Sequence, residues 1–137
     1  MDGVVLIVHR LALTGAQIDA LRSRLVRLRE RGKRVVCWAS GYDTARYKLA
    51  CAAGTILLQR GGTVLPLGVQ RNAVFVRDLL ARIGVELDVV RSGPHKTAMD
   101  MFTRQELSDE LREMLQWLTE DAWSRLLEAV AAGRGLE

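Results

Sequence analysis

The sequence has 137 residues, which suits one ordinary globular domain and leaves no room for a second core of similar size. Hydrophobic residues make up 49% of it and charged residues 26%, a balance that excludes intrinsic disorder and predicts a packed core. The formal net charge is +4, yet only three of the 20 basic residues are lysines, namely Lys33, Lys48 and Lys96. The apolar run at 4–8 is far too short for a membrane span, which needs about 20 residues.

Two cysteines and a basic run invite functional interpretations. Cys37 and Cys51 lie in apolar surroundings with no histidine at a zinc-binding spacing, so we interpret them as buried thiols, with a disulfide as the alternative. The basic run at 22–34 could face a polyanion. We favour a solvated helix face and expect no nucleic-acid partner, because the chain has few aromatic residues and no nucleic-acid motif.

The first half of the chain reads as alternating strands and helices. In order, the pattern predicts a strand at 3–8, a helix from the Thr14 cap to Gly32, a strand at 35–39, a helix at about 43–53 and a strand at 55–58. The first strand begins so close to Met1 that we expect its bare edge to be covered by an upstream strand or by a partner.

The second half continues this alternation. Asn72 is expected to cap a helix that ends at Gly84, and residues 85–90 are expected to form a fourth strand. A turn-rich connection at 91–97 follows, and a long helix runs from about Ser108 to Gly133. Apolar strands that alternate with helices predict the α/β class, with a mostly parallel sheet buried on both faces and flanked by helices, in a single domain over residues 1–137.

The usual enzyme motifs are missing from the sequence. There is no phosphate-binding loop, no dinucleotide fingerprint, no zinc-protease helix and no hydrolase elbow, so no cofactor or metal is expected. The two histidines, His9 and His95, are far apart, and we expect an ordinary packing or surface role for His9.

Lys96 is the candidate for chemistry. With His95 it follows a Gly93-Pro94 turn at the carboxyl end of the predicted fourth strand, where open α/β sheets place reactive groups. Lysine can act as a base when burial lowers its pKa from about 10.4 toward 7, whereas arginine stays charged. The apolar residues at 98–102 could desolvate the amine, and the Thr97 hydroxyl could hold it. The alternative is an ordinary surface lysine.

Several segments resemble one known family. The stretch 90–98, followed by 102–104 and by the acid-rich helix start at 108–110, resembles the lysine region of signal peptide peptidase A, also called protease IV. Residues 75–87 are similar to that family's K-D-L-L-x-K-x-G-V segment. Residues 32–36 resemble its G-K-P-V-V strand, and residues 47–53 its Y-Y-L-A-S-A-A helix.

The resemblance implies a ClpP/crotonase-like α/β fold and a peptidase in which a lysine base activates a serine nucleophile. Lys96 maps onto the base, with Gly93, His95 and Thr97 as supporting residues of its turn. The family's S-G-G-Y nucleophile motif reads Thr44-Ala45-Arg46-Tyr47 here, so no serine stands at that position. Only the Thr44 hydroxyl and the upstream Ser40 remain nearby. The S-P-G-G turn that would form the oxyanion hole is replaced by residues 12–15.

This pattern resembles the first, lysine-bearing domain of the tandem form of the family. The resemblance implies an extended hydrophobic peptide as substrate, a serine-bearing domain or subunit as partner, and a homo-oligomer. It also implies a place on the outer side of the cytoplasmic membrane, through an anchor upstream of Met1. Because the pattern keeps the lysine and lacks the serine, the chain is expected to be part of a larger two-domain peptidase and to be inactive alone. The arginine-rich helix and the pair Trp117 and Trp123 are candidates for packing against the partner, and the alternative is that the tryptophans only cover the sheet. The alternative function is a non-catalytic assembly or binding module.

Overall fold

The computed structural model describes residues 2–89 and 97–136. The chain forms two compact units. The sheet unit comprises residues 1–69 and 123–137, and the groove unit comprises residues 70–122. Helix α5 (Asp109–Arg134) contributes residues to both. The expectation of a single domain over residues 1–137 stays a prediction.

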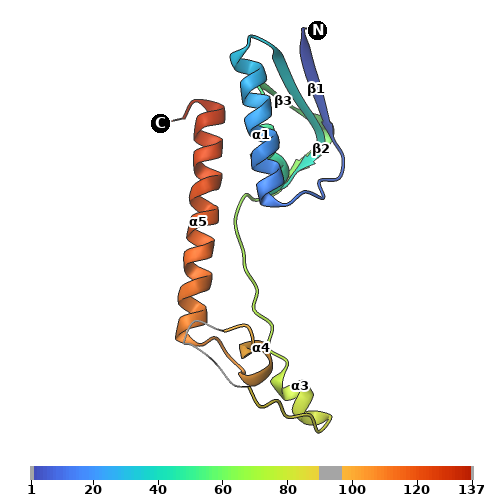
Figure 1. Ribbon diagram of the computed structural model, residues 1–137. Coiled ribbons are helices and arrows are strands. Elements are labelled where there is room, and N and C mark those ends of the chain that lie inside the picture. Colours follow the sequence, from blue (N-terminus) through green and yellow to red (C-terminus); the bar gives the residue numbers. More distant parts are fainter. Residues whose placement is uncertain (1, 90–96, 137) are drawn as a thin grey trace. The chain divides into compact units, whose positions relative to one another are not determined.

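Three parallel strands build the sheet unit, in the spatial order β1 (Gly3–Val8), β2 (Arg34–Tyr42) and β3 (Thr55–Val64). Helix α1 (Gly15–Glu30) connects the first two strands, and helix α2 (Thr44–Ala50) connects the second and third. Figure 1 shows α1 lying across one face of the sheet. The predicted order of five elements and the α/β class are therefore confirmed, and the parallel sheet with flanking helices is compatible with the expected ClpP-like fold.

The start of α1 follows directly from its sequence. The Thr14 hydroxyl accepts a hydrogen bond from the backbone N–H of Gln17, and the Gln17 side chain accepts one from the backbone N–H of Thr14. This reciprocal pair satisfies two N–H groups that a helix N-terminus would otherwise leave open. The prediction that Thr14 caps this helix is therefore confirmed.

The core lies on the side of the sheet that α1 and α2 cover. Val35, Cys37 and Ala39 alternate along β2 as buried residues, since successive side chains of a strand point to opposite faces. On the other face, Val5 and Ile7 of β1 are 65% and 57% exposed, and Leu57 of β3 is 46% exposed. The expectation of a sheet buried on both faces is therefore wrong for the described residues, because both crossover helices pack on the same side.

Strands β2 and β3 are longer than predicted. Their pairing continues past Leu58 after an irregularity, so that Gly41 pairs with Thr63 and Tyr42 with Val64. The glycine pair at 61–62 lies within β3 at this bulge. Glycines in a strand often mark such a bulge, because they permit the local change in backbone direction.

In the groove unit, two predictions were wrong. Helix α3 (Arg77–Arg82) begins after Val76, and Asn72 does not cap it. The segment before it is extended, and the Val76 N–H donates to the Met101 carbonyl at 2.7 Å. Residues 85–89 form no strand, because Val85 folds back to donate to the Leu80 carbonyl. The stretch 85–89 alternates three apolar residues with two acids, a pattern that a strand can also have.

The remaining elements are two helices. Helix α4 (Asp100–Thr103) was not predicted. Helix α5 was predicted with its start within one residue. Its predicted end at Gly133 also lies within one residue of the observed end at Arg134, and Gly135 after it adopts the left-handed φ of 65°. No described helix is long and apolar enough to cross a membrane.

Candidate functional site

Gly93, His95 and Lys96 lie outside the described residues, so the site is built from the residues that follow them. Thr97 is 6% exposed, and its carbonyl accepts a hydrogen bond from the Asp100 N–H at 2.9 Å. This bond closes a turn that leads from the lysine segment into α4. The residue directly after the predicted base is therefore buried at the start of a turn whose middle residues, Ala98 and Met99, are exposed.

A buried carboxylate lies at the end of this turn. Asp100 is fully buried, and the Ser108 hydroxyl donates to its Oδ2 atom at 2.7 Å. Ser108 is itself buried, and its Oγ accepts from the Leu111 N–H at the start of α5. The Arg104 Nε atom lies 3.8 Å from the same Asp100 oxygen. These contacts tie the turn after Lys96 to the N-terminus of α5.

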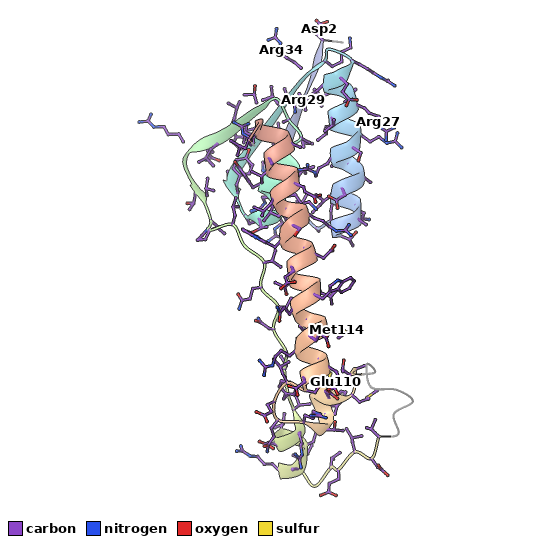
Figure 2. The ribbon with its side chains drawn as sticks, turned by 90° about the vertical axis from the view of Figure 1, so that its left-hand side faces the viewer. Asp2, Arg27, Arg29, Arg34, Glu110 and Met114 are labelled. Carbon is purple, nitrogen blue, oxygen red and sulfur yellow. The ribbon has the colours of Figure 1, made fainter. Side chains whose placement is uncertain are left out.

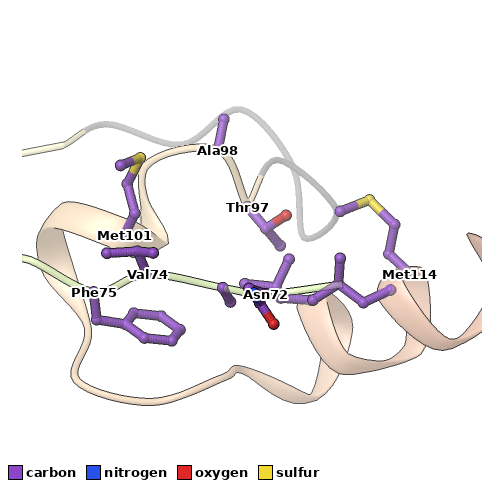
Figure 3. Close-up of a pocket in the computed structure, with 10 residues that line it drawn as sticks. Asn72, Val74, Phe75, Thr97, Ala98, Met101 and Met114 are labelled. Atoms are coloured by element: carbon purple, nitrogen blue, oxygen red, sulfur yellow. The ribbon is translucent and has the colours of Figure 1, made fainter. Parts of the chain in front are cut away.

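Beside Thr97 lies an apolar groove of about 650 Å³. Three parts of the groove unit line it: the extended segment before α3, the turn into α4, and the first turns of α5. Its lining residues are Asn72, Ala73, Val74, Phe75, Thr97, Ala98, Met101, Leu111, Met114 and Leu115. Figure 3 shows Phe75 and Met101 at one end, with Thr97 and Met114 toward the other. The groove is suited to apolar side chains, and its methionines can adjust their shape.

Thr44, at the family's serine position, has its hydroxyl occupied by the backbone. Its Oγ1 donates to the Gly68 carbonyl at 3.0 Å and accepts from the Gly68 N–H at 3.1 Å. Ser40 lies exposed on β2 at the irregular pairing with β3. In the sheet unit, the described contacts of Thr44 therefore fix a loop and do not activate a nucleophile.

Within the basic run, one arginine differs from the others. Arg22 is partly buried: its guanidinium donates to the Lys48 carbonyl, and its Nη2 atom donates to the Ala129 carbonyl at 3.3 Å. Burial lowers the pKa of Arg22 from its usual value. Figure 2 marks Arg27 and Arg29 on α1 and Arg34 at the start of β2. These three residues are exposed, although the Arg29 Nη1 atom also donates to the Ala52 carbonyl at 3.4 Å.

The cysteines behave as predicted, because Cys37 and Cys51 are both buried and free. Burial raises the pKa of each thiol above its ordinary value of 9.0.

His9 stacks edge-on against Trp38, with ring centroids 5.9 Å apart. Trp117 and Trp123, which could pack against a partner or cover the sheet, are 65% and 41% exposed.

Sequence reasoning missed Asp100, Ser108 and Arg22. Ser108 carried a signal, since a serine directly before two acidic residues is typical of a helix N-cap. Asp100 follows Lys96 by four residues, but nothing in the sequence predicted its burial. Arg22 was grouped with neighbouring arginines whose side chains are more exposed, such as Arg24 and Arg27.

Comparison with known proteins agrees with the resemblance. The profile of Peptidase family S49 matches residues 27–137, so this chain belongs to that family. It is 26% identical over 133 residues to "Serine protease SPPA, chloroplastic" of Arabidopsis thaliana, an alignment that covers 97% of this chain and 20% of that protein.

Two bacterial relatives carry the name "Protease 4". The Haemophilus influenzae protein is 26% identical over 121 residues, and the Salmonella typhi protein is 32% identical over 125. Each alignment covers 88% of this chain and 20% of the relative. The chain therefore spans about a fifth of the length of these relatives.

Proposed function

We propose that this chain supplies the lysine general base of a Ser/Lys-dyad endopeptidase, and that the nucleophilic serine comes from another domain or subunit. Membership of a peptidase family and relatives named as proteases support the class of reaction. The observation that carries the proposal is the burial of Thr97 beside an apolar groove, directly after the lysine that matches the family's base.

In this mechanism the neutral amine of Lys96 takes the proton of the partner's serine as the serine oxygen attacks a peptide carbonyl. The ammonium then gives that proton to the leaving amine, and water resolves the acyl-enzyme. Lys96 needs a low-dielectric setting to be neutral near pH 7. The burial of the adjacent Thr97 supports such a setting. Gly93, His95 and Thr97 would shape the turn that presents the amine.

The groove also supports the substrate class. An extended hydrophobic peptide, such as a remnant signal peptide, would place an apolar side chain between Phe75, Met101 and Met114. The outer side of the cytoplasmic membrane remains the proposed location, and a homo-oligomer the proposed assembly. The exposed Trp117 is available for contact with the serine-bearing partner.

The test is to produce the chain together with a serine-bearing domain or subunit of the same family, and to measure cleavage of an apolar fluorogenic peptide. Lys96→Ala should lower kcat by at least about 100-fold, the usual size of a general-base contribution. Lys33→Ala is the matched control, because Lys33 is exposed in the sheet unit, and it should keep the full rate. An active assembly that is unaffected by Lys96→Ala would show that Lys96 is not the base.

A non-catalytic assembly module is the second candidate. It is favoured by one observation: the Thr44 hydroxyl at the family's serine position is bound to the Gly68 backbone. In that case the co-produced complex forms and shows no peptidase activity that depends on Lys96.

A further inference from the structure

Strand β1 forms an open edge of the sheet unit. The spatial order β1-β2-β3 leaves one side of β1 without a paired strand among the described residues, and Figure 1 shows β1 at the border of the sheet. The Arg34 N–H of β2 donates to the Asp2 carbonyl at 3.2 Å, and the polar groups of every second residue of a strand point to the same side. The N–H and C=O groups of Gly3, Val5 and Ile7 therefore point toward the open edge.

The two edges of the sheet differ in how they are protected. Folded proteins discourage unwanted pairing at an edge strand with charges, prolines or bulges. Strand β3, at the other edge, carries Arg60, and its pairing with β2 is irregular between Ala39 and Gly41. By contrast, residues 3–8 of β1 are uncharged and pair with β2 in unbroken register. The edge at β1 is therefore suited to pairing with another strand.

The partner that fits this edge is β1 of a second copy. In an antiparallel pair, residues whose polar groups point toward each other lie directly opposite, so odd-numbered residues of β1 face odd-numbered residues of the other copy. A symmetric register centred on Leu6 obeys this rule and brings Asp2 next to Arg10 at both ends of the pair. A register centred on Val5 also obeys it, but it brings Asp2 next to Val8.

Charge favours the register centred on Leu6. Asp2 and Arg10 are exposed, and neither forms an ion pair among residues 2–89 and 97–136. The pairing brings these opposite charges together twice, and opposite charges on facing strands stabilise the pair. The same register sets the exposed Val5 opposite the exposed Ile7, so that each covers the other's apolar surface.

We propose that two copies of this chain pair antiparallel through β1, with Leu6 at the two-fold axis, so that the three strands of each copy form one continuous sheet. The inference deepens the homo-oligomer of the proposed function and rests on that part of it. The assembly closes after two copies, because the pairing is self-complementary and each copy has one unprotected edge.

Sedimentation equilibrium of the full chain measures the pairing. The expected species is a dimer of twice 15.3 kDa that dissociates on dilution. Val5→Lys should raise the dissociation constant at least about tenfold, because a charge on an edge strand opposes pairing. Leu57→Lys is the matched control, since Leu57 is exposed on the same face of the sheet but belongs to β3, and it should leave the constant unchanged.

Charge reversal tests the identity of the occupant. Asp2→Arg should weaken the dimer, because it places two arginines side by side at both ends of the pair. The double variant Asp2→Arg with Arg10→Asp should restore the dissociation constant of the wild type. Both positions are exposed, so this test applies even if Val5→Lys does not fold.

Amide hydrogen exchange tests the contact itself. The N–H groups of Val5 and Ile7 should exchange slowly in the concentrated dimer and fast after dilution, because only the second copy gives them acceptors. The Leu6 N–H, which faces β2, should exchange slowly in both samples.

Three results would overturn the proposal: a chain that stays monomeric at high concentration, one that aggregates without a defined dimer, or a dimer that neither Val5→Lys nor Asp2→Arg weakens. A dimer that Leu57→Lys abolishes would indicate contact through the face of the sheet and would also overturn it. The proposed function is judged separately, by the effect of Lys96→Ala on peptide cleavage. A monomeric chain in an assembly that needs Lys96 would refute only the pairing through β1.

Discussion

The Thr44 hydroxyl and the Gly68 backbone form two hydrogen bonds, one in each direction, of 3.0 and 3.1 Å. The first residue of α2 is thereby joined to the segment that follows β3. This relationship gives the residue at the family's serine position a structural role.

Thr44→Val should therefore lower the free energy of unfolding without affecting catalysis by an assembled enzyme. The loss of two backbone contacts predicts about 1–2 kcal/mol, because a typical hydrogen bond contributes about 0.5–1.5 kcal/mol. Urea denaturation measures this change. Thr44→Ser keeps the hydroxyl and is the matched control. A fluorophosphonate probe should label neither wild type nor Thr44→Ser, and labelling that requires the residue 44 hydroxyl would contradict the assignment.

Arg22 is the second position with a specific prediction. Arg22→Lys should destabilise the fold by about 1–3 kcal/mol, since a single amine cannot donate to both the Lys48 and Ala129 carbonyls with the same geometry. Arg24→Lys, in an exposed position of the same helix, should change stability by less than about 0.5 kcal/mol. Thermal unfolding followed by circular dichroism compares the two variants, and equal shifts would mean that Arg22 does not link these segments.

Two helical glycines should respond to alanine in opposite directions. A Cβ atom at Gly133 would overlap the Cys51 carbonyl, so Gly133→Ala should destabilise the sheet unit by about 1–3 kcal/mol. A Cβ atom at Gly15 meets nothing within 4 Å, so Gly15→Ala at the start of α1 should stabilise by about 0.5–1 kcal/mol. Chemical denaturation of both variants tests the pair, and a neutral or stabilising Gly133→Ala would disprove the close approach of α5.

The buried thiols predict a loss of stability at alkaline pH. Burial raises the pKa of Cys37 and of Cys51 above 9.0, so each folded thiol keeps its proton while the unfolded thiol loses it. The folded state then binds more protons, and the free energy of unfolding should fall as pH rises above about 9, by up to about 1.4 kcal/mol per pH unit for each cysteine.

The control for this pH effect is a cysteine variant. Cys51→Ala should reduce the alkaline slope by the share of one thiol, as measured by urea denaturation between pH 8 and 10. Below pH 8, ionisation of the thiols should cause no pH dependence of the unfolding free energy in either the wild type or Cys51→Ala. An unchanged slope in Cys51→Ala would assign the alkaline effect to other groups, such as Tyr42, whose pKa burial also raises.

The sequence by itself determined the features that depend on local pattern. The apolar run at 3–8, the Thr14 cap and the spacing of Ile18 and Leu25 predict β1 and α1, because strand alternation, capping and helical periodicity are local properties. The lysine turn carried the family assignment in the same way, through residues adjacent in the chain.

Only the tertiary structure decided the rest. The stretch at 85–89 alternates apolar and acidic residues as a strand can, but a strand needs a partner, and the chain provides none there among the described residues. The burial of Asp100 beside Ser108, and the different roles of Arg22 and Arg24, depend on which elements pack against them. Burial and hydrogen-bond partners are set by contacts distant in sequence, and no local pattern contains them.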